Sequence, residues 1–240
     1  MVELELDDGV AIITINRPES RNAIAPDTMD GLEKALDDVA DARALVITGG
    51  GDRAFVSGGD LRELAKMRTE DEAYAFAVRM RAICDRIAAF PGPSIAALNG
   101  HALGGGAEVA VAADIRVAAD GVLIGFTQAT LAVMPAWGGA ERLAELVGRG
   151  RALMLAGTGR VLGAADAERL GLVDTVLPRE SFDEGWRSLA KSLATAAAVE
   201  TKHVMKGGSS TDDVARRFAR LWVADDHWAA VDGVLNRAKK

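Results

Sequence analysis

The 240-residue sequence contains only one cysteine and three histidines. Cys84 has no partner within the chain, which excludes an internal disulfide and a cysteine-based metal site. Its place on the apolar stripe of an expected helix predicts a small buried hydrophobe. The histidines, His101, His203 and His227, are too scattered in sequence to suggest a metal site, so no metal is expected.

Long apolar runs and excess positive charge are also missing. No stretch approaches the roughly 20 apolar residues that a membrane span needs, and the N-terminus lacks the basic start and apolar run of a signal peptide. The net charge of -7 gives no sequence-wide attraction for nucleic acid or anionic lipid. We therefore expect a soluble, cytoplasmic protein with no nucleic-acid or membrane partner.

Three common catalytic motifs are absent as well. No Gly-x-x-x-x-Gly-Lys-Ser/Thr pattern is present, and the glycines at 104–106 lack the dinucleotide spacing, so neither ATP hydrolysis nor NAD binding is supported. Ser57 has no Gly-x-Ser-x-Gly elbow around it, and no histidine partner can be singled out, which argues against a serine nucleophile.

What the sequence does contain is an alternation of strand and helix patterns typical of an α/β fold. The patterns predict strands at 10–15, 44–48, 94–98, 115–117 and 122–124, and helices at 26–39, 73–87 and from Gly105 onward. Helical patterns dominate the C-terminal third. The length and the 49% hydrophobic content suffice for one large core.

Two glycine loops stand where backbone N–H groups would be free. Ser57, Gly58, Gly59 and Asp60 follow a strand-like segment, with Asp60 suited to cap the helix that opens at residue 61. The glycines at 104–106 precede a second helix that carries Glu108. Fixed N–H donors from such loops lower the barrier of reactions in which a thioester carbonyl becomes negatively charged.

These residues resemble signatures of the crotonase (enoyl-CoA hydratase/isomerase) superfamily nearly end to end. The matching segments are Asn16-Arg17-Pro18, Arg21-Asn22-Ala23, residues 57–61, residues 99–108, Ala113-Asp114-Ile115-Arg116, residues 135–139, Gly171-Leu172-Val173-Asp174 and Asp226-His227. The resemblance implies repeated ββα units in a core at 1–180, and a helical region at 181–240 used for trimerisation. It further implies a homo-oligomer, a trimer or a hexamer, and coenzyme A as part of the substrate rather than a separate cofactor.

The resemblance also assigns site residues. It places the oxyanion donors on the N–H groups of Ser57 and Gly105, and the catalytic carboxylate on Glu108. The predicted substrate-binding residues are Asn22, Ala23, Ser57, Gly58, Gly59, Asp60, Gly105 and Trp137. Lys202 and Lys206 resemble positions that contact CoA phosphates, although a solvated basic face is an equal reading.

The second catalytic glutamate of the family falls on Gln128, which cannot exchange a proton near neutral pH. The leading prediction is an enoyl-CoA hydratase in which Glu108 handles water and proton while Gln128 orients the water. Residues 134–139 resemble a variant of decarboxylase-like members, with the bulky Trp137 beside the acyl pocket, so a malonyl-type acyl-CoA decarboxylase is the alternative. An enoyl-CoA isomerase ranks below it, and a non-catalytic acyl-CoA binding protein remains open.

Overall fold

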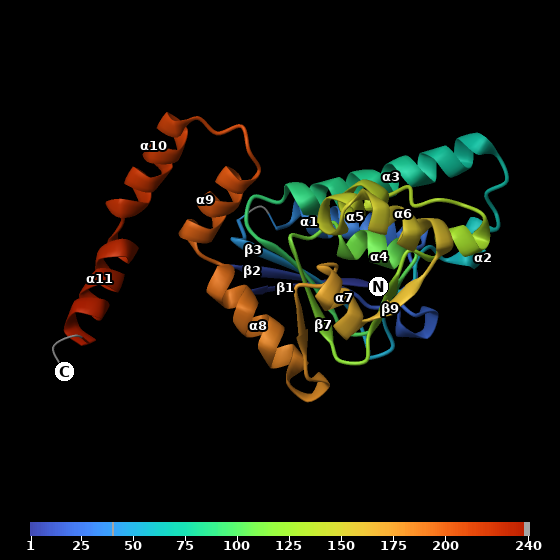
Figure 1. The fold of residues 1–240 in the computed structure, drawn as a ribbon, viewed down its shortest axis with the longest axis horizontal. Helices are drawn as coiled ribbons and strands as arrows, with labels where there is room; N and C mark the ends of the chain where they lie inside the picture. Colours follow the sequence, from blue (N-terminus) through green and yellow to red (C-terminus); the bar gives the residue numbers. More distant parts are fainter. Residues whose placement is uncertain (40, 238–240) are drawn as a thin grey trace.

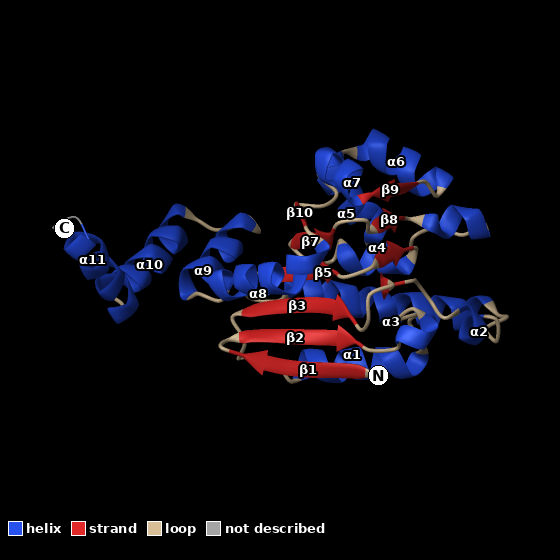
Figure 2. Cartoon of the chain, turned by 90° about the horizontal axis from the view of Figure 1, so that it is seen from below, coloured by secondary structure: helices blue, strands red, loops and turns tan. Residues whose placement is uncertain are grey.

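The computed structural model describes residues 1–39 and 41–237 as two β-sheets surrounded by helices, with a helical arm at the C-terminus (Figures 1 and 2). The strands are β1 (Val2–Asp7), β2 (Val10–Ile15), β3 (Ala44–Gly49), β4 (Ala54–Val56), β5 (Ser94–Leu98), β6 (His101–Leu103), β7 (Ile115–Ala119), β8 (Leu123–Gly125), β9 (Val161–Gly163) and β10 (Thr175–Leu177).

The helices follow the same numbering along the chain. They are α1 (Pro26–Asp37), α2 (Leu61–Leu64), α3 (Glu70–Ala89), α4 (Gly105–Ala110), α5 (Gly139–Val147), α6 (Arg149–Thr158), α7 (Ala164–Leu170), α8 (Phe182–Leu193), α9 (Ala196–Met205), α10 (Thr211–Trp222) and α11 (Asp225–Arg237). Three short 3₁₀ helices occur within the described residues, η1 (Pro18–Ser20), η2 (Thr127–Leu131) and η3 (Arg179–Ser181).

From β3 to β8, successive strands alternate between the two sheets. The first sheet has the order β1-β2-β3-β5-β7-β10 and is parallel except for β1, and the second has the order β4-β6-β8-β9 and is parallel except for β9. The pairs β3 and β4, β5 and β6, and β7 and β8 each place one strand in each sheet before the chain enters a helix. This confirms the predicted repetition of ββα units.

The apolar strands of the first sheet form the centre of the core. Every residue of β3 and β5 is buried, which agrees with their continuous apolar sequences, because a parallel sheet is covered on both faces. Helix α3 contributes Met80, Ile83, Cys84 and Ile87 from one apolar stripe. Cys84 is fully buried and burial raises its pKa to about 12, which confirms the prediction of an inert hydrophobic residue.

Two of the segments that resemble the family are joined by an ion pair between the buried Arg116 and the more exposed Asp174. The Arg116 side chain on β7 is buried, donates to the Asp174 carboxylate and donates a 2.9 Å bond to the Leu172 carbonyl oxygen. The Arg116 backbone N–H also donates to Asp174, at 2.8 Å. These contacts fix the loop before β10, which extends the first sheet beside β7.

The C-terminal helices divide into a docked part and an arm. Helix α8 packs on the first sheet, whereas α10 and α11 project away from the body in both views (Figures 1 and 2). A helical C-terminal third is therefore confirmed over the described residues, and residues 238–240 of the predicted region at 181–240 lie outside them. The division at residue 180 and the use of this region for trimerisation stay predictions.

Most predicted elements occur within a few residues of their expected bounds, but several short strands were missed. Strands β2 and β5 match their predicted ranges, while α3 is longer than predicted at both ends. The sequence reading treated 99–101 as loop, whereas His101–Leu103 forms β6. This strand is too short for a periodic signal, and pairing with β4 and β8 is what makes it a strand.

Candidate functional site

The candidate site lies where three adjacent strands of the second sheet end. Strand β4 leads into Ser57, β6 leads into Gly104, and β8 leads through Phe126 into Gln128. Because β4, β6 and β8 are parallel neighbours, their carboxyl ends meet at one edge of the sheet. The fold therefore brings together three of the segments that the sequence singled out, at 57–60, 104–108 and 128.

The two glycine loops touch each other at this edge. A methyl group built on Gly58 would lie 3.3 Å from the Leu103 carbonyl oxygen and 3.4 Å from the Gly105 nitrogen. Gly58 has φ +107° and Gly104 has φ +55° with ψ -120°, conformations that residues with a side chain rarely adopt. Glycine at these two positions lets the two main chains come together.

The N–H groups of the first loop are used unequally. Ser57 donates its N–H to the Arg21 carbonyl oxygen at 3.2 Å, so this predicted oxyanion donor is already occupied. Ile24 binds the Gly58 carbonyl oxygen and the Asp60 N–H, at 2.8 and 2.7 Å, as in a parallel ladder. Since successive residues of an extended chain direct their polar groups to opposite sides, the N–H of Gly59 is directed away from Ile24.

Several N–H groups of the two loops are free within the described residues, those of Gly58, Gly59, Gly105 and Gly106, and the groups of Gly59 and Gly105 bear on the site. Neither Gly59 nor Gly105 donates its N–H to an acceptor within residues 1–39 and 41–237. Gly59 was predicted from the sequence as a substrate-binding residue, and the structure adds that its N–H has no acceptor within the described residues. No local pattern distinguishes it from Ser57, because the assignment depends on the pairing of this loop with Ile24.

Glu108 is a buried carboxylate that accepts four hydrogen bonds. Its side chain lies on α4, and the residue is 2% exposed. Oε1 accepts from Gln128 Nε2 at 2.8 Å and from Ala136 N at 3.3 Å, and Oε2 accepts from Trp137 N at 2.7 Å and Gly139 N at 3.0 Å. Burial raises the pKa of Glu108, and the four donors oppose that rise without cancelling it.

Gln128 stands next to Glu108 with half of its amide unused. Its Nε2 donates to Glu108, while its Oε1 is buried and has no hydrogen-bond partner within the described residues. A buried acceptor without a partner costs free energy on the order of 1–3 kcal/mol, so a donor from water or substrate at this position would be stabilising. The predicted proximity of residues 108 and 128 is observed, and their roles stay predictions.

Trp137 packs beside both Glu108 and Gly105. The residue is 6% exposed, and its backbone N–H is the donor to Glu108 Oε2. A methyl group built on Gly105 would overlap the indole ring, at 2.1 Å from Cζ3 and 2.3 Å from Cη2. The ring also contacts Phe76 of α3 edge to face, with centroids 5.9 Å apart.

The predicted substrate-binding residues Asn22 and Ala23 each line a cavity, while their polar groups named below bond within the loop. Asn22 is buried, accepts from Arg17 N at 2.8 Å and donates to the Ala54 carbonyl oxygen at 2.7 Å. The Ala23 carbonyl oxygen accepts from Arg17 Nη1 at 2.6 Å. Asp60 pairs with Arg17 Nη2 at 3.2 Å and caps α2 through Arg62 N, which confirms the predicted cap.

Two cavities meet at Arg21, which the sequence reading did not single out as a binding residue. One, of about 450 Å³, is lined by residues that include Gly59, Asp60 and Arg62, and the other, of about 380 Å³, by residues that include Ser57, Arg53 and His101. Arg21, Arg53 and Arg62 line these cavities together with the carboxylates of Glu19, Asp52 and Asp60. Arg21 belongs to the matching segment at 21–23, whereas Arg53 and Arg62 carry no sequence signal apart from charge.

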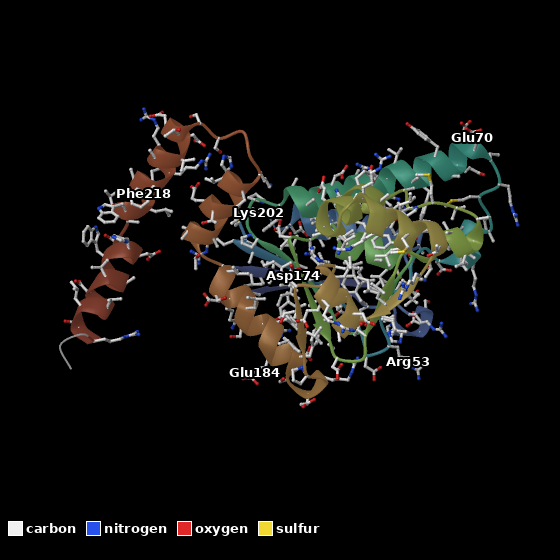
Figure 3. All side chains as sticks on the ribbon, viewed as in Figure 1. Arg53, Glu70, Asp174, Glu184, Lys202 and Phe218 are labelled. Atoms are coloured by element: carbon white, nitrogen blue, oxygen red, sulfur yellow. The ribbon has the colours of Figure 1, made fainter. Side chains whose placement is uncertain are left out.

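Lys202 is engaged elsewhere. Its Nζ lies 2.6 Å from Asp114 Oδ2 and donates to the Gly92 carbonyl oxygen at 2.9 Å, and burial lowers its pKa. Figure 3 shows Lys202 on the side of the body that carries the arm and Arg53 on the far side. Within one chain, Lys202 is therefore not part of the cavities at Arg21.

Two further features, a membrane-spanning helix and a metal site, are absent from the described residues. Among residues 1–39 and 41–237, no helix is both long enough and apolar enough to span a bilayer. Over the same residues, no cluster of three or more histidine, cysteine or acidic side chains has the arrangement of a metal site.

Comparison with known proteins gives a consistent result. The family model described as enoyl-CoA hydratase/isomerase matches residues 5–220. A probable enoyl-CoA hydratase of Mycobacterium tuberculosis is 37% identical over 218 residues, covering 90% of this chain and 81% of the relative. A short-chain-enoyl-CoA hydratase of Clostridium acetobutylicum is 34% identical over 204 residues, covering 84% and 78%. The crystal structure of an enoyl-CoA hydratase from Bacillus anthracis superposes with a TM-score of 0.88 at 29% identity, covering 98% of this chain and 96% of that one.

Proposed function

Because the chain belongs to the enoyl-CoA hydratase/isomerase family, we propose that it is an enoyl-CoA hydratase that adds water across the 2,3 double bond of an acyl-CoA thioester. The observation that carries the proposal is the buried Glu108 carboxylate beside the unpartnered Gln128 Oε1, at the same sheet edge as two free N–H groups. The edge thus offers a base, a water acceptor and an anion site together.

The two free N–H groups serve the thioester oxygen. When water adds to C3, the electron pair of the double bond moves through C2 onto the thioester oxygen and forms an enolate. Gly59 and Gly105 N–H donate to that oxygen, and each such donor is worth about 10²- to 10³-fold in rate. Ser57 takes part if its 3.2 Å bond to Arg21 is exchanged for the substrate.

Glu108 and Gln128 handle the water. The water donates one hydrogen bond to Gln128 Oε1 and transfers its other proton to Glu108 as its oxygen bonds to C3. Glu108 then returns this proton to C2 as the enolate collapses, so that atoms and charge balance with one ionisable residue. To accept a proton, Glu108 must release one of its four donors, and the 3.3 Å bond from Ala136 is the longest.

The cationic cavities bind the rest of the substrate in this proposal. The phosphates of coenzyme A are anionic, and Arg21, Arg53 and Arg62 supply the positive charges of the two cavities, whose linings also contain Glu19, Asp52 and Asp60. Coenzyme A is in this view part of the substrate, and the chemistry uses no separate cofactor.

A malonyl-type acyl-CoA decarboxylase is the second candidate. Loss of CO₂ from such a thioester also gives a thioester enolate and needs the oxyanion donors, but it needs no base. The observation that favours it is the saturation of Glu108 by four donors, which opposes proton uptake from water. Hydration ranks first because the unpartnered Gln128 Oε1 suits a water molecule.

The proposed assembly is a homo-oligomer in which the arm of one chain packs on another. Helices α10 and α11 expose an apolar set that the rest of the described chain does not cover, namely Val214, Phe218, Trp222, Val223, Trp228, Val234 and Leu235. Figure 3 shows Phe218 on the arm, well away from the body. Apolar exposure on this scale is typical of an interaction surface.

The test of function is mass-resolved turnover of crotonyl-CoA. We expect the wild type to add one water and Glu108→Ala to lose at least about 10²-fold, the loss that removal of a general base causes. Glu145→Ala, which removes an exposed glutamate from the neighbouring helix α5, is the matched control and should retain the rate. Absence of hydrated product in the wild type would refute hydration of this substrate, and release of CO₂ from malonyl-CoA would then establish the second candidate.

A further inference from the structure

Trp137 borders the space that the acyl chain beyond the reacting carbons would occupy. In the proposed function, the thioester oxygen lies at the Gly105 N–H and C3 lies at Glu108. These two residues are three positions apart on α4 and therefore lie on one face of the helix. The reacting atoms span this face, and any carbons beyond C3 continue past Glu108.

Trp137 contacts both Gly105 and Glu108 on this face of α4, through its side chain and its main chain respectively. Its indole lies against Gly105, within reach of a methyl group built there, while its backbone N–H binds Glu108 Oε2. The ring thus stands at the Gly105 end of the reacting unit, and the Trp137 backbone stands at the Glu108 end. A side chain of this size removes volume that the carbons beyond C3 would otherwise fill.

The indole cannot easily be displaced. Phe76 of α3 packs against it edge to face, and the Trp137 carbonyl oxygen accepts from Arg142, which in turn pairs with Asp85 of α3. The N–H of Gly139 also binds Glu108 Oε2, and a methyl group built on Gly139 would lie 2.4 Å from Glu108 Cγ. The segment that carries the indole is therefore packed closely against Glu108.

We propose that Trp137 determines acyl-chain length and restricts the protein to short acyl-CoA thioesters of about four carbons, with the indole occupying the path of a longer chain. The inference rests on the proposed function for the orientation of the thioester. It goes beyond that function by naming the substrate class, short acyl-CoA thioesters. The indole should limit the binding of longer chains as well as their turnover.

Binding of saturated thioesters, which cannot be hydrated, tests whether Trp137 limits the length of the acyl chain. Calorimetry with butyryl-CoA and decanoyl-CoA gives an affinity ratio in which the shared CoA contribution cancels. We expect the wild type to gain nothing from the longer chain and Trp137→Ala to shift the ratio toward decanoyl-CoA by at least about 10-fold, since each buried methylene favours binding. Trp186→Ala, a buried tryptophan on α8 outside the site, is the matched control and should leave the ratio unchanged.

Turnover of enoyl-CoA substrates of four, six, eight and ten carbons is the second readout. In the wild type, kcat/KM should fall by at least about 10-fold between four and eight carbons, and Trp137→Ala should flatten this fall. Trp137→Phe keeps a smaller ring and should lie between the two, and it decides the question if circular dichroism shows that Trp137→Ala is unfolded.

The outcomes separate the two proposals. A wild type that binds decanoyl-CoA at least about 10-fold more tightly than butyryl-CoA, or a ratio that no Trp137 variant changes, overturns the role of Trp137 even if hydration is observed. A wild type that discriminates by chain length as expected, but hydrates no enoyl-CoA, supports the role of Trp137 in limiting chain length and refutes the hydratase proposal.

Discussion

Gln128 Nε2 donates a 2.8 Å hydrogen bond to Glu108 Oε1, and the other half of the same amide, Oε1, is buried without a partner. One side chain therefore both holds the proposed base and presents a free acceptor next to it. A glutamate at this position would offer a second ionisable group, which the observed amide cannot.

Replacement of Gln128 by glutamate should add general acid–base capacity. Two carboxylates this close cannot both be charged at low cost, so one of them should hold a proton near neutral pH. We expect Gln128→Glu to hydrate crotonyl-CoA about 10²- to 10⁴-fold faster than the wild type and to show a bell-shaped pH profile of kcat/KM. Gln128→Met, similar in shape but without the amide, should be slower than the wild type. A Gln128→Glu enzyme no faster than wild type would contradict the proposal that a second ionisable group at position 128 speeds the proton transfers.

The wild type should show a single ionisation on the acidic side of its rate profile. Burial raises the pKa of Glu108 above its usual value near 4.5, so kcat/KM should fall as pH drops through a value above 4.5. Stability should change in the opposite sense. Because the folded-state pKa is raised, the Glu108 contribution to the free energy of unfolding falls as pH rises from 4.5 through that value. Denaturant unfolding of wild type and Glu108→Ala across this window should show the wild type losing stability relative to the variant, and a constant difference would contradict the raised pKa.

Gly105 and Trp137 should be energetically coupled. A methyl group on Gly105 would overlap the indole, so Gly105→Ala should destabilise the protein by about 1–3 kcal/mol through overpacking. In a Trp137→Ala background the same change should cost less, which a double-mutant cycle of unfolding free energies measures. Additive effects would show that the two residues do not share the space described above.

The arm should be required for assembly. Trp222 is the centre of an aromatic cluster, with ring centroids 5.5 Å from Phe218, 4.5 Å from His227 and 5.9 Å from Trp228, and it is 46% exposed. Trp222→Glu places a charge on this apolar surface. Light scattering should give a multiple of the 25.1 kDa chain mass for the wild type and a lower mass for the variant. Equal masses would locate the interface elsewhere.

The sequence alone determined the longer elements named below and the family. Continuous apolar runs specified β2 and β5, one apolar stripe specified the buried face of α3, and the ordered motifs identified the superfamily, because each of these signals is local along the chain. The resemblance also predicted Glu108 and Gln128 as the catalytic pair, and the structure places their side chains in contact.

Only the tertiary structure decided how the backbone groups and side chains of the site are used. Pairing with Ile24 leaves Gly59 free, and the contact with Arg21 occupies Ser57, a distinction that two neighbouring loop residues do not carry in sequence. The indole of Trp137 meets Gly105 across 32 positions because parallel strands and the helix α4 bring distant segments to one edge. Local patterns determine which residues form strands and helices, whereas strand pairing and packing determine which of their polar groups remain unsatisfied and which space remains open.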